Sequence, residues 1–163
     1  GCIDNGGRLL PPELAPEKVR RYIRPDGQGN GVFYLTENVY LTAADVRSLQ
    51  LAKAAVAGGI EVLLARHGIK AGDLSRVCLA GGFGNYIDPK SAMALGMLPE
   101  ISPERLRCLG NTSLAGASMA AVDPECRREL RSCAEKSEYI ELSGLREFTE
   151  AFTDNMTFDI TED

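Results

Sequence analysis

The sequence has few of the residues on which most enzyme active sites depend. It contains one histidine, no tryptophan and five cysteines, and no two cysteines are spaced as CxxC. Zinc sites and iron–sulfur cradles need clustered Cys or His ligands. Catalysis by a Ser/His/Asp or Cys/His set needs a histidine beside a nucleophile, and the single His67 has no identifiable partner. The residues therefore indicate no catalytic set and no metal site.

The common nucleotide and nucleic-acid signals are absent too. There is no GxxxxGK[ST], and GGFGN lacks the spacing of GxGxxG. Lys and Arg number 18 against 23 Asp and Glu, giving a net charge of −5, which argues against a nucleic-acid surface. With no signal peptide, no long apolar run and an odd number of cysteines, we expect a cytoplasmic protein outside the membrane. The 163 residues suffice for one domain, or for one lobe of a larger one.

One glycine-rich stretch stands out, VCLAGGFGNYI, from Val77 to Ile87. It reads as a short strand, Val77 to Ala80, that runs into Gly81, Gly82, Phe83 and Gly84. Without a Cβ, glycine can take positive φ and lets a ring or a phosphate approach the backbone. A tight turn that binds nothing explains three glycines equally well.

A second strand, about Leu106 to Leu109, ends in the same way at Gly110 and Asn111 and leads into a small-residue helix, 113–122. The strand, glycine turn and helix order thus occurs twice. If the two strands are neighbours in a parallel sheet, both turns face one crevice.

The longest predicted element is a helix over roughly 43–67. Thr42 and Asp45 have the spacing of a capping box at its start. Gly58 and Gly59 in its middle predict close approach of another element, because glycine weakens a helix by about 1 kcal/mol relative to alanine. The predicted apolar face is Val46, Leu49, Val56, Ile60 and Leu63.

Lys53 falls within this apolar stripe, and Gln50 lies one turn earlier on nearly the same side. A lysine there either extends its ammonium to the edge of the stripe or meets an anion. The residues leave both alternatives open.

The other elements follow from turn and capping signals. Residues 1–31 are rich in Gly and Pro and are expected to be mostly irregular, with a helical turn after Pro16. Cys78 and Cys108, in apolar strand contexts, are expected to be buried. The further predicted elements are strands at 32–35, 39–41 and 139–142 and helices at 89–97, 124–137 and 145–156, followed by a frayed acidic end at 159–163.

Four acidic residues near loops could hold Mg²⁺ through water, a weak signature, although such residues usually face solvent. They are Asp45, Glu61, Asp73 and Asp88.

Several blocks resemble a known family. VCLAGGFGNYIDPKSAMALGMLP is preceded by TAADVRSLQLAKAAVAGGIEVLL and followed by GNTSLAGA and EYIEL. Together they resemble the C-terminal ATPase-fold part of the reductive activators of corrinoid proteins, and the resemblance runs from Gly1 to about Phe158. That family belongs to the superfamily of actin, sugar kinases and heat-shock chaperones.

The resemblance implies an α/β fold, a ribonuclease-H-like lobe whose mixed sheet is flanked by helices. It implies an ATP-dependent protein that passes an electron from its own [2Fe-2S] cluster to an inactive Co(II) corrinoid. Gly81, Gly82, Phe83 and Gly84 would line the adenosine, with Gln50 and Lys53 on the other side of the nucleotide. Asn85, Gly110 and Asn111 are the further candidates for contact.

The family's cluster-binding cysteines and the superfamily's phosphate-binding hairpins belong to regions outside this chain. We therefore expect a partial ATP and Mg²⁺ site, no redox centre, and no ATP hydrolysis by this chain alone. Residues 1–31 are expected to continue from an earlier lobe, 32–158 to form the nucleotide-binding lobe, and 159–163 to be an acidic tail.

The implied partner is the corrinoid protein of a methyltransferase system, and a homodimer is left open. Two other classes stay open beside this one. The first is a non-catalytic protein-interaction or dimerisation module that keeps the fold, and the second is a small-molecule kinase whose catalytic residue lies elsewhere.

Overall fold

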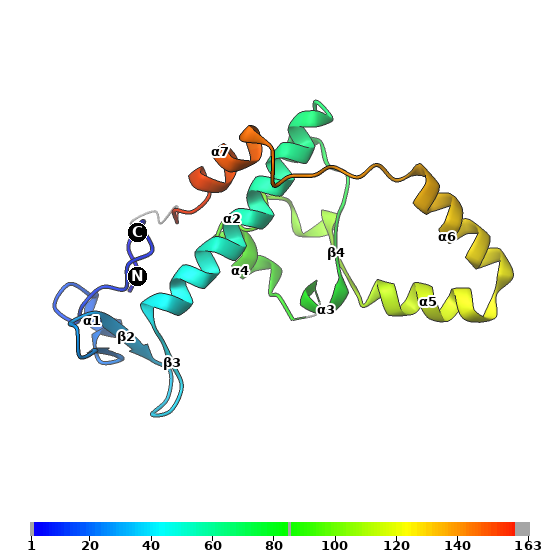
Figure 1. The fold of residues 1–163 in the computed structure, drawn as a ribbon. Coiled ribbons are helices and arrows are strands. Elements are labelled where there is room, and N and C mark those ends of the chain that lie inside the picture. Colours follow the sequence, from blue (N-terminus) through cyan, green and yellow to red (C-terminus); the bar gives the residue numbers. More distant parts are fainter. Residues whose placement is uncertain (1, 85, 159–163) are drawn as a thin grey trace.

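A computed structural model describes residues 2–84 and 86–158, and its ribbon is shown in Figure 1. The long helix α2 crosses the molecule, with a small antiparallel sheet at one of its ends and a parallel pair of strands beside the other half (Figure 1). The helices are α1 Glu17–Arg20, α2 Ala43–Arg66, α3 Gly81–Gly84, α4 Pro89–Ala94, α5 Thr112–Val122, α6 Pro124–Lys136 and α7 Arg146–Asp154, with 3₁₀ turns at Ala71–Asp73 and Pro103–Arg105. The strands are β1 Ile23–Pro25, β2 Gly31–Tyr34, β3 Tyr40–Leu41, β4 Val77–Ala80 and β5 Leu106–Gly110.

The antiparallel sheet has the order β1-β2-β3. The predicted strands at 32–35 and 39–41 are confirmed as the antiparallel pair β2 and β3, and α1 confirms the helical turn after Pro16. The prediction of an irregular stretch is wrong at β1. The Asp26 carboxylate accepts hydrogen bonds from the backbone N–H groups of Gln28 and Asn30, both at 2.8 Å, and closes a turn that pairs β1 with β2.

The N-terminus of α2 forms as predicted. The Asp45 N–H donates to Thr42 Oγ1 at 3.2 Å, and the Thr42 N–H donates to Asp45 Oδ2 at 2.8 Å. This reciprocal pair satisfies two backbone donors at a helix end, where the helix supplies no partner. The Thr42 hydroxyl also donates to Asp45 Oδ2, at 2.7 Å, and this bond, followed by the one from the Thr42 N–H, holds the pKa of Asp45 below its usual value.

Low pH should therefore weaken the start of α2. Because the pKa of Asp45 is lower in the folded chain, its contribution to stability is present above the unfolded pKa of about 3.9 and is lost as pH falls through the folded pKa. We expect the difference in free energy of unfolding between the wild type and Asp45→Asn to shrink between pH 7 and pH 2.5. Denaturant titrations at both pH values measure it, and a constant difference would contradict the assignment.

The middle of α2 packs against α7, as its two glycines predict. A Cβ built on Gly58 would lie 3.0 Å from the Phe152 N atom and 3.3 Å from the Ala151 carbonyl carbon. Such contacts are too short for any side chain larger than hydrogen without movement of α7. Gly58 therefore sets the distance between the two helices.

The predicted apolar face of α2 is only partly the buried one. Val46 is buried, but Val56 and Leu63 are 42% and 41% exposed. Gln50 and Lys53 are buried instead, each 3% exposed. The buried face of α2 includes Gln50 and Lys53, because α7 and the residues that follow α7 cover that side of the helix.

Gln50 and Lys53 fasten the ends of the described chain to α2. Gln50 Nε2 donates to the carbonyl oxygens of Gly6 at 3.0 Å and Met156 at 2.8 Å. Lys53 Nζ donates to those of Asn155 at 2.7 Å and Thr157 at 2.8 Å. The core lies at the same place, where Leu9, Val46 and Phe158 meet.

The parallel sheet consists of β4 and β5. The prediction that Cys78 and Cys108 are buried is wrong, since both are exposed. In the described part of the chain, each of these strands has one neighbour and no further strand continues the sheet. The apolar pattern of the strands predicted that Cys78 and Cys108 lie beneath another layer of the fold. The described part of the chain does not cover them.

No strand forms at 139–142, so that prediction is also wrong. Tyr139 is 81% exposed, and its hydroxyl donates to Glu141 Oε2 at 2.5 Å. The Ser143 hydroxyl and the Tyr139 hydroxyl hold the pKa of Glu141 low, at about 2. Local side-chain bonds thus shape a segment in which sequence alone predicts β structure.

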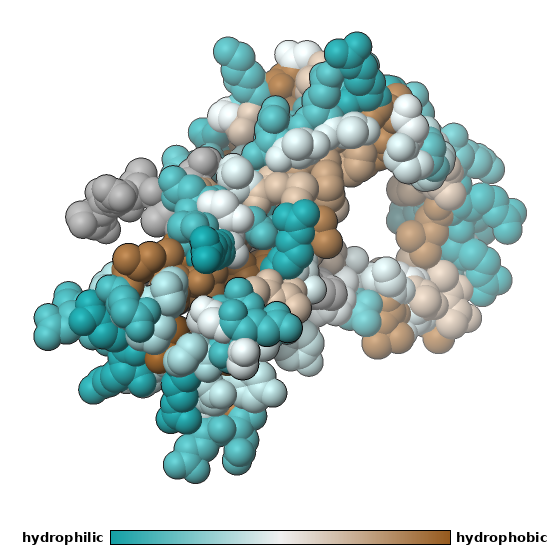
Figure 2. Space-filling model, turned by 60° about the vertical axis from the view of Figure 1, so that its left-hand side comes forward, coloured by the Kyte–Doolittle hydropathy of each residue, from teal (hydrophilic) through white to brown (hydrophobic). Residues whose placement is uncertain are grey.

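The two helices α5 and α6 form an arm that stands away from the rest of the molecule (Figures 1 and 2). Leu114, Met119 and Val122 of α5 are 64%, 57% and 84% exposed. Cys126 and Cys133 of α6 are half-buried and exposed, respectively. The arm therefore carries apolar side chains at the surface.

Within the described residues, α2 is the one helix long and apolar enough to cross a membrane by length and composition. Its buried Gln50 and Lys53 bond to the chain's own backbone, so α2 serves here as the central helix of the fold.

Candidate functional site

Both glycine turns lie at one edge of the parallel sheet. The two strands β4 and β5 pair in parallel, and Ala80, the last residue of β4, is opposite Gly110, the last of β5. The two strands therefore meet the condition under which both turns face one crevice, since they are neighbours in a parallel sheet. The carboxyl ends of parallel strands, where loops lead into helices, are where open α/β sheets bind ligands.

Glycine is required where each strand ends, at Gly81 directly after β4 and at Gly110, the last residue of β5. Gly81 has φ +90° and Gly110 has φ +67°, a region that residues with a Cβ rarely adopt. The turn at Gly81 leads directly into the short helix α3.

Gly82 is different, because nothing within the described chain explains it. It has no positive φ, and a Cβ built on it would meet no atom within 4 Å. Neither backbone strain nor packing therefore demands glycine there. A ligand that lies directly against the backbone of Gly82 explains why this position has no side chain.

The remaining candidates at this edge differ in what the structure describes. The backbone of Phe83 and Gly84 belongs to α3, and Asn85 lies outside the described residues. Asn111 is the N-cap of α5, where its Oδ1 accepts from the Leu114 N–H at 3.0 Å. The first turn of a helix has backbone N–H groups without partners inside the helix and favours negative charge, so α5 adds anion-binding capacity to this edge.

Gln50 and Lys53 are engaged elsewhere. Their side-chain donors bond to the backbone carbonyls of Gly6 and of residues 155–157, and each is almost completely buried. Of the two alternatives for Lys53, extension to the edge of the stripe is wrong, because its side chain is not in solvent. A nucleotide contact by either residue stays a prediction.

This second role of Gln50 and Lys53 was missed in the sequence. The signal was present as two polar side chains one turn apart inside an apolar stripe. Their partners were not identifiable, because they lie 44 to 106 residues away in the sequence and are backbone carbonyls, which carry no residue-specific mark.

Comparison with known proteins identifies the fold family. A family described as the C-terminal domain of RACo, the ASKHA domain, matches residues 7–163. The chain belongs to this family.

Two relatives agree with that membership. The chain is 35% identical over 122 residues, 75% of its length, to the corrinoid activation enzyme RamQ of Eubacterium limosum. It superposes with a TM-score of 0.84 and 30% identity on a solved structure named reductive activator for corrinoid, iron–sulfur protein, with 99% of the chain covered. The α/β class and the ASKHA lobe are thereby confirmed.

The chain spans only part of these relatives. It covers 21% of the RamQ sequence and 26% of the solved chain. What the whole relatives do is accordingly carried to this ASKHA domain only as a proposal.

The four acidic residues considered for Mg²⁺ lie on different elements of the ASKHA domain. Asp45 and Asp88 cap α2 and α4, and the Ser91 hydroxyl and N–H hold the pKa of Asp88 below its usual value. Asp73 accepts from the Lys70 N–H, and Glu61 from Asn155 Nδ2. Across residues 2–84 and 86–158, no three His, Cys, Asp or Glu side chains are grouped so as to hold a metal ion.

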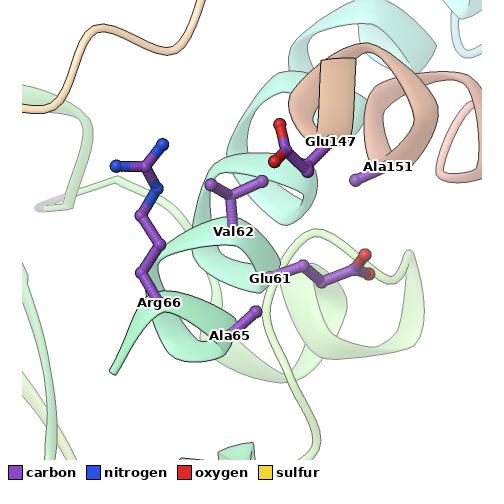
Figure 3. A pocket seen from close by; sticks show the side chains of 6 residues that line it. All are labelled: Glu61, Val62, Ala65, Arg66, Glu147 and Ala151. Atoms are coloured by element: carbon purple, nitrogen blue, oxygen red, sulfur yellow. The ribbon is translucent and has the colours of Figure 1, made fainter. Parts of the chain in front are cut away.

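A hollow of about 400 Å³ lies between α2 and α7. Figure 3 shows its floor formed by Val62, Ala65 and Ala151, with Glu61, Glu147 and Arg66 around it. The three charged ends point in different directions and do not converge on one point (Figure 3). This hollow results from the crossing of the two helices and has no arrangement suited to a ligand.

Proposed function

We propose that this chain is the nucleotide-binding C-terminal lobe of an ATP-dependent reductive activator of corrinoid proteins. The observation that carries the proposal is the paired glycine turns at the β4 and β5 ends, with Gly82 facing open space. The named relatives, a corrinoid activation enzyme and a reductive activator, support the choice of reaction.

In this proposal the backbone of Gly81, Gly82, Phe83 and Gly84 lines the adenosine, and Gly110 and Asn111 border it. Asn85 belongs to the same prediction. Gln50 and Lys53 stay predicted contacts on the other side of the nucleotide, although their present bonds give them first a structural role. ATP would supply the free energy of its hydrolysis to ADP and phosphate. This free energy would drive an electron transfer that is otherwise unfavourable.

The electron comes from outside this lobe. A [2Fe-2S] cluster would supply, from its reduced form, the one electron needed to reduce Co(II) to Co(I). The five cysteines of this chain lack the spacing to hold a cluster, so the proposal places it elsewhere in the activator. The partner is the corrinoid protein of a methyltransferase system, in the cytoplasm, and Mg²⁺ accompanies ATP with ligands from outside this chain.

The test uses the whole activator. We expect reduction of Co(II) to Co(I) on the corrinoid partner, followed by visible absorbance, to require ATP and to be lost in Gly82→Val. Cluster absorbance in the same samples shows whether the redox centre is intact. ATP-independent reduction, or full activity of the variant, would contradict the proposal.

The α5–α6 arm favours a second candidate function, a protein-interaction or dimerisation module without nucleotide. The exposed apolar residues of α5 are its specific support. Sedimentation with and without ATP separates the candidates: a dimer that is indifferent to ATP, in a protein that binds no nucleotide, favours the interaction module.

A further inference from the structure

A cavity of about 690 Å³ lies between α2 and α4, in a different place from the glycine edge. One wall is a single face of α2, with residues at helical spacing, and the other is the end of α4 with the turn that follows it. Lys53, Ala57 and Glu61 lie on the α2 wall, and Gly96, Leu98 and Glu100 lie on the opposite wall.

The walls are mostly apolar, and the volume is that of a pocket for a small organic molecule. Ala57 and Leu98, which line the cavity on its two walls, are each 8% exposed. Gly96 has φ +71°, and a Cβ on it would lie 3.4 Å from Lys53 Nζ. The turn after α4 can therefore lie close to α2 and close that side of the cavity.

The charge that a ligand meets there is negative. Glu61 and Glu100 are exposed carboxylates on the two facing walls. Lys53 also lines the cavity, but it is 3% exposed, and its ammonium donates to two backbone carbonyls. A ligand with a positive group is therefore favoured over one with a negative group.

Glu61 is also oriented. Asn155 Nδ2 donates to Glu61 Oε1 at 2.8 Å, which leaves the other carboxylate oxygen for a ligand. Figure 3 shows this carboxylate pointing away from Glu147 and from the floor of the hollow between α2 and α7. Glu61 therefore borders both hollows, and its bond to Asn155 places it beside another residue of the cavity at α4.

We propose that this cavity binds a small organic amine, with the protonated amino group at Glu61 and the apolar body between α2 and α4. The ammonium donates hydrogen bonds to the free carboxylate oxygen of Glu61, and Glu100 adds to the attraction from the opposite wall. Lys53, a predicted nucleotide contact, borders this cavity, but Glu61 and Glu100, which hold the amine, are not part of the proposed nucleotide site, so the amine site would exist if that proposal failed.

The test compares two probes of equal shape, 4-phenylbutylamine and 4-phenylbutanoic acid, added to the ¹⁵N-labelled protein. We expect the amine to shift backbone amide signals in 57–64 and 94–100 and the acid to leave them unchanged. Glu61→Gln keeps an oxygen that accepts from Asn155 but removes the charge, and should weaken amine binding about tenfold. Glu147→Gln, the same change on α7, is the matched control and should bind as the wild type does.

A second variant tests the apolar part of the site. Ala57→Leu places three more carbon atoms in the cavity and should abolish the shifts, while amide spectra report whether the fold is kept. If Glu61→Gln does not fold, Glu100→Gln replaces it, with an expected loss of about threefold because it acts from the facing wall. Equal binding of amine and acid, no shifts with the amine, or unchanged affinity in Glu61→Gln would each overturn the proposal.

Discussion

Replacement of Lys53 by methionine should lower the free energy of unfolding by about 3 kcal/mol. Methionine fills a similar volume but has no donor, so the carbonyl oxygens of Asn155 and Thr157 lose a charged partner at 2.7 and 2.8 Å. Lys53 is 3% exposed, so its two carbonyl partners depend mainly on the ammonium for a hydrogen-bond donor. Its contact with the Phe158 ring, at 5.7 Å from Nζ to the ring centroid, is lost as well.

Denaturant unfolding of the wild type and the Lys53 variant measures this difference. The control is Lys136→Met, at the exposed end of α6, where we expect a change within about 0.5 kcal/mol. Hydrogen exchange should also show faster opening of residues 155–158 in Lys53→Met, because these residues lose their attachment to α2. Equal stability of the two variants would mean that the buried bonds contribute little.

Alanine at Gly58 and alanine at Gly59 should have opposite effects, about 2 kcal/mol apart. In a helix alanine is favoured over glycine by up to about 1 kcal/mol, which both variants gain. At Gly59 the new Cβ meets Leu142 Cδ1 at 3.5 Å, an ordinary contact. At Gly58 it meets the Phe152 backbone N at 3.0 Å, so α7 must move.

Thermal unfolding of the two neighbouring variants checks this directly. We expect Gly59→Ala to melt at or above the wild type and Gly58→Ala to melt below it. Because the two positions share one helix and one substitution, propensity cancels in the comparison. If the variants melt together, the close approach of α7 does not determine the stability of this pair of helices.

The parts of the fold that were predictable have local causes. The capping box at Thr42 and Asp45 and the two strand-to-glycine turns each depend on residues a few positions apart. The parallel pairing of β4 and β5, by contrast, was left open, because it joins two segments that α3 and α4 separate in the sequence. The glycine pair in α2 predicted a close neighbour but not that the neighbour is α7.

The features that could not be predicted depend on hydrogen-bond partners far away in the sequence, or on which elements cover a surface. Lys53 and Gln50 bond to carbonyls about a hundred residues along the chain, and no side chain marks those carbonyls. Cys78 follows strand periodicity, yet its burial depends on what lies over the sheet. The 139–142 segment has β-forming residues but pairs with no strand in the described part of the chain.

The two glycine turns also remain the centre of the functional account. The structure brings Gly81 and Gly110 to one edge, and Gly82 is the position there that neither φ nor packing explains. A nucleotide that lies against this backbone explains why residue 82 is glycine.

Calorimetric titration of Mg-ATP into the protein and into two glycine variants tests this claim most directly. A Cβ meets open space at both Gly82 and Gly72, but Gly72 lies in the 3₁₀ turn before β4, toward the amino end of the strand. We predict that Gly82→Val loses at least about a hundredfold in affinity, because its side chain occupies the nucleotide's place, while Gly72→Val binds as the wild type does. Equal affinity of Gly82→Val and the wild type would contradict the account.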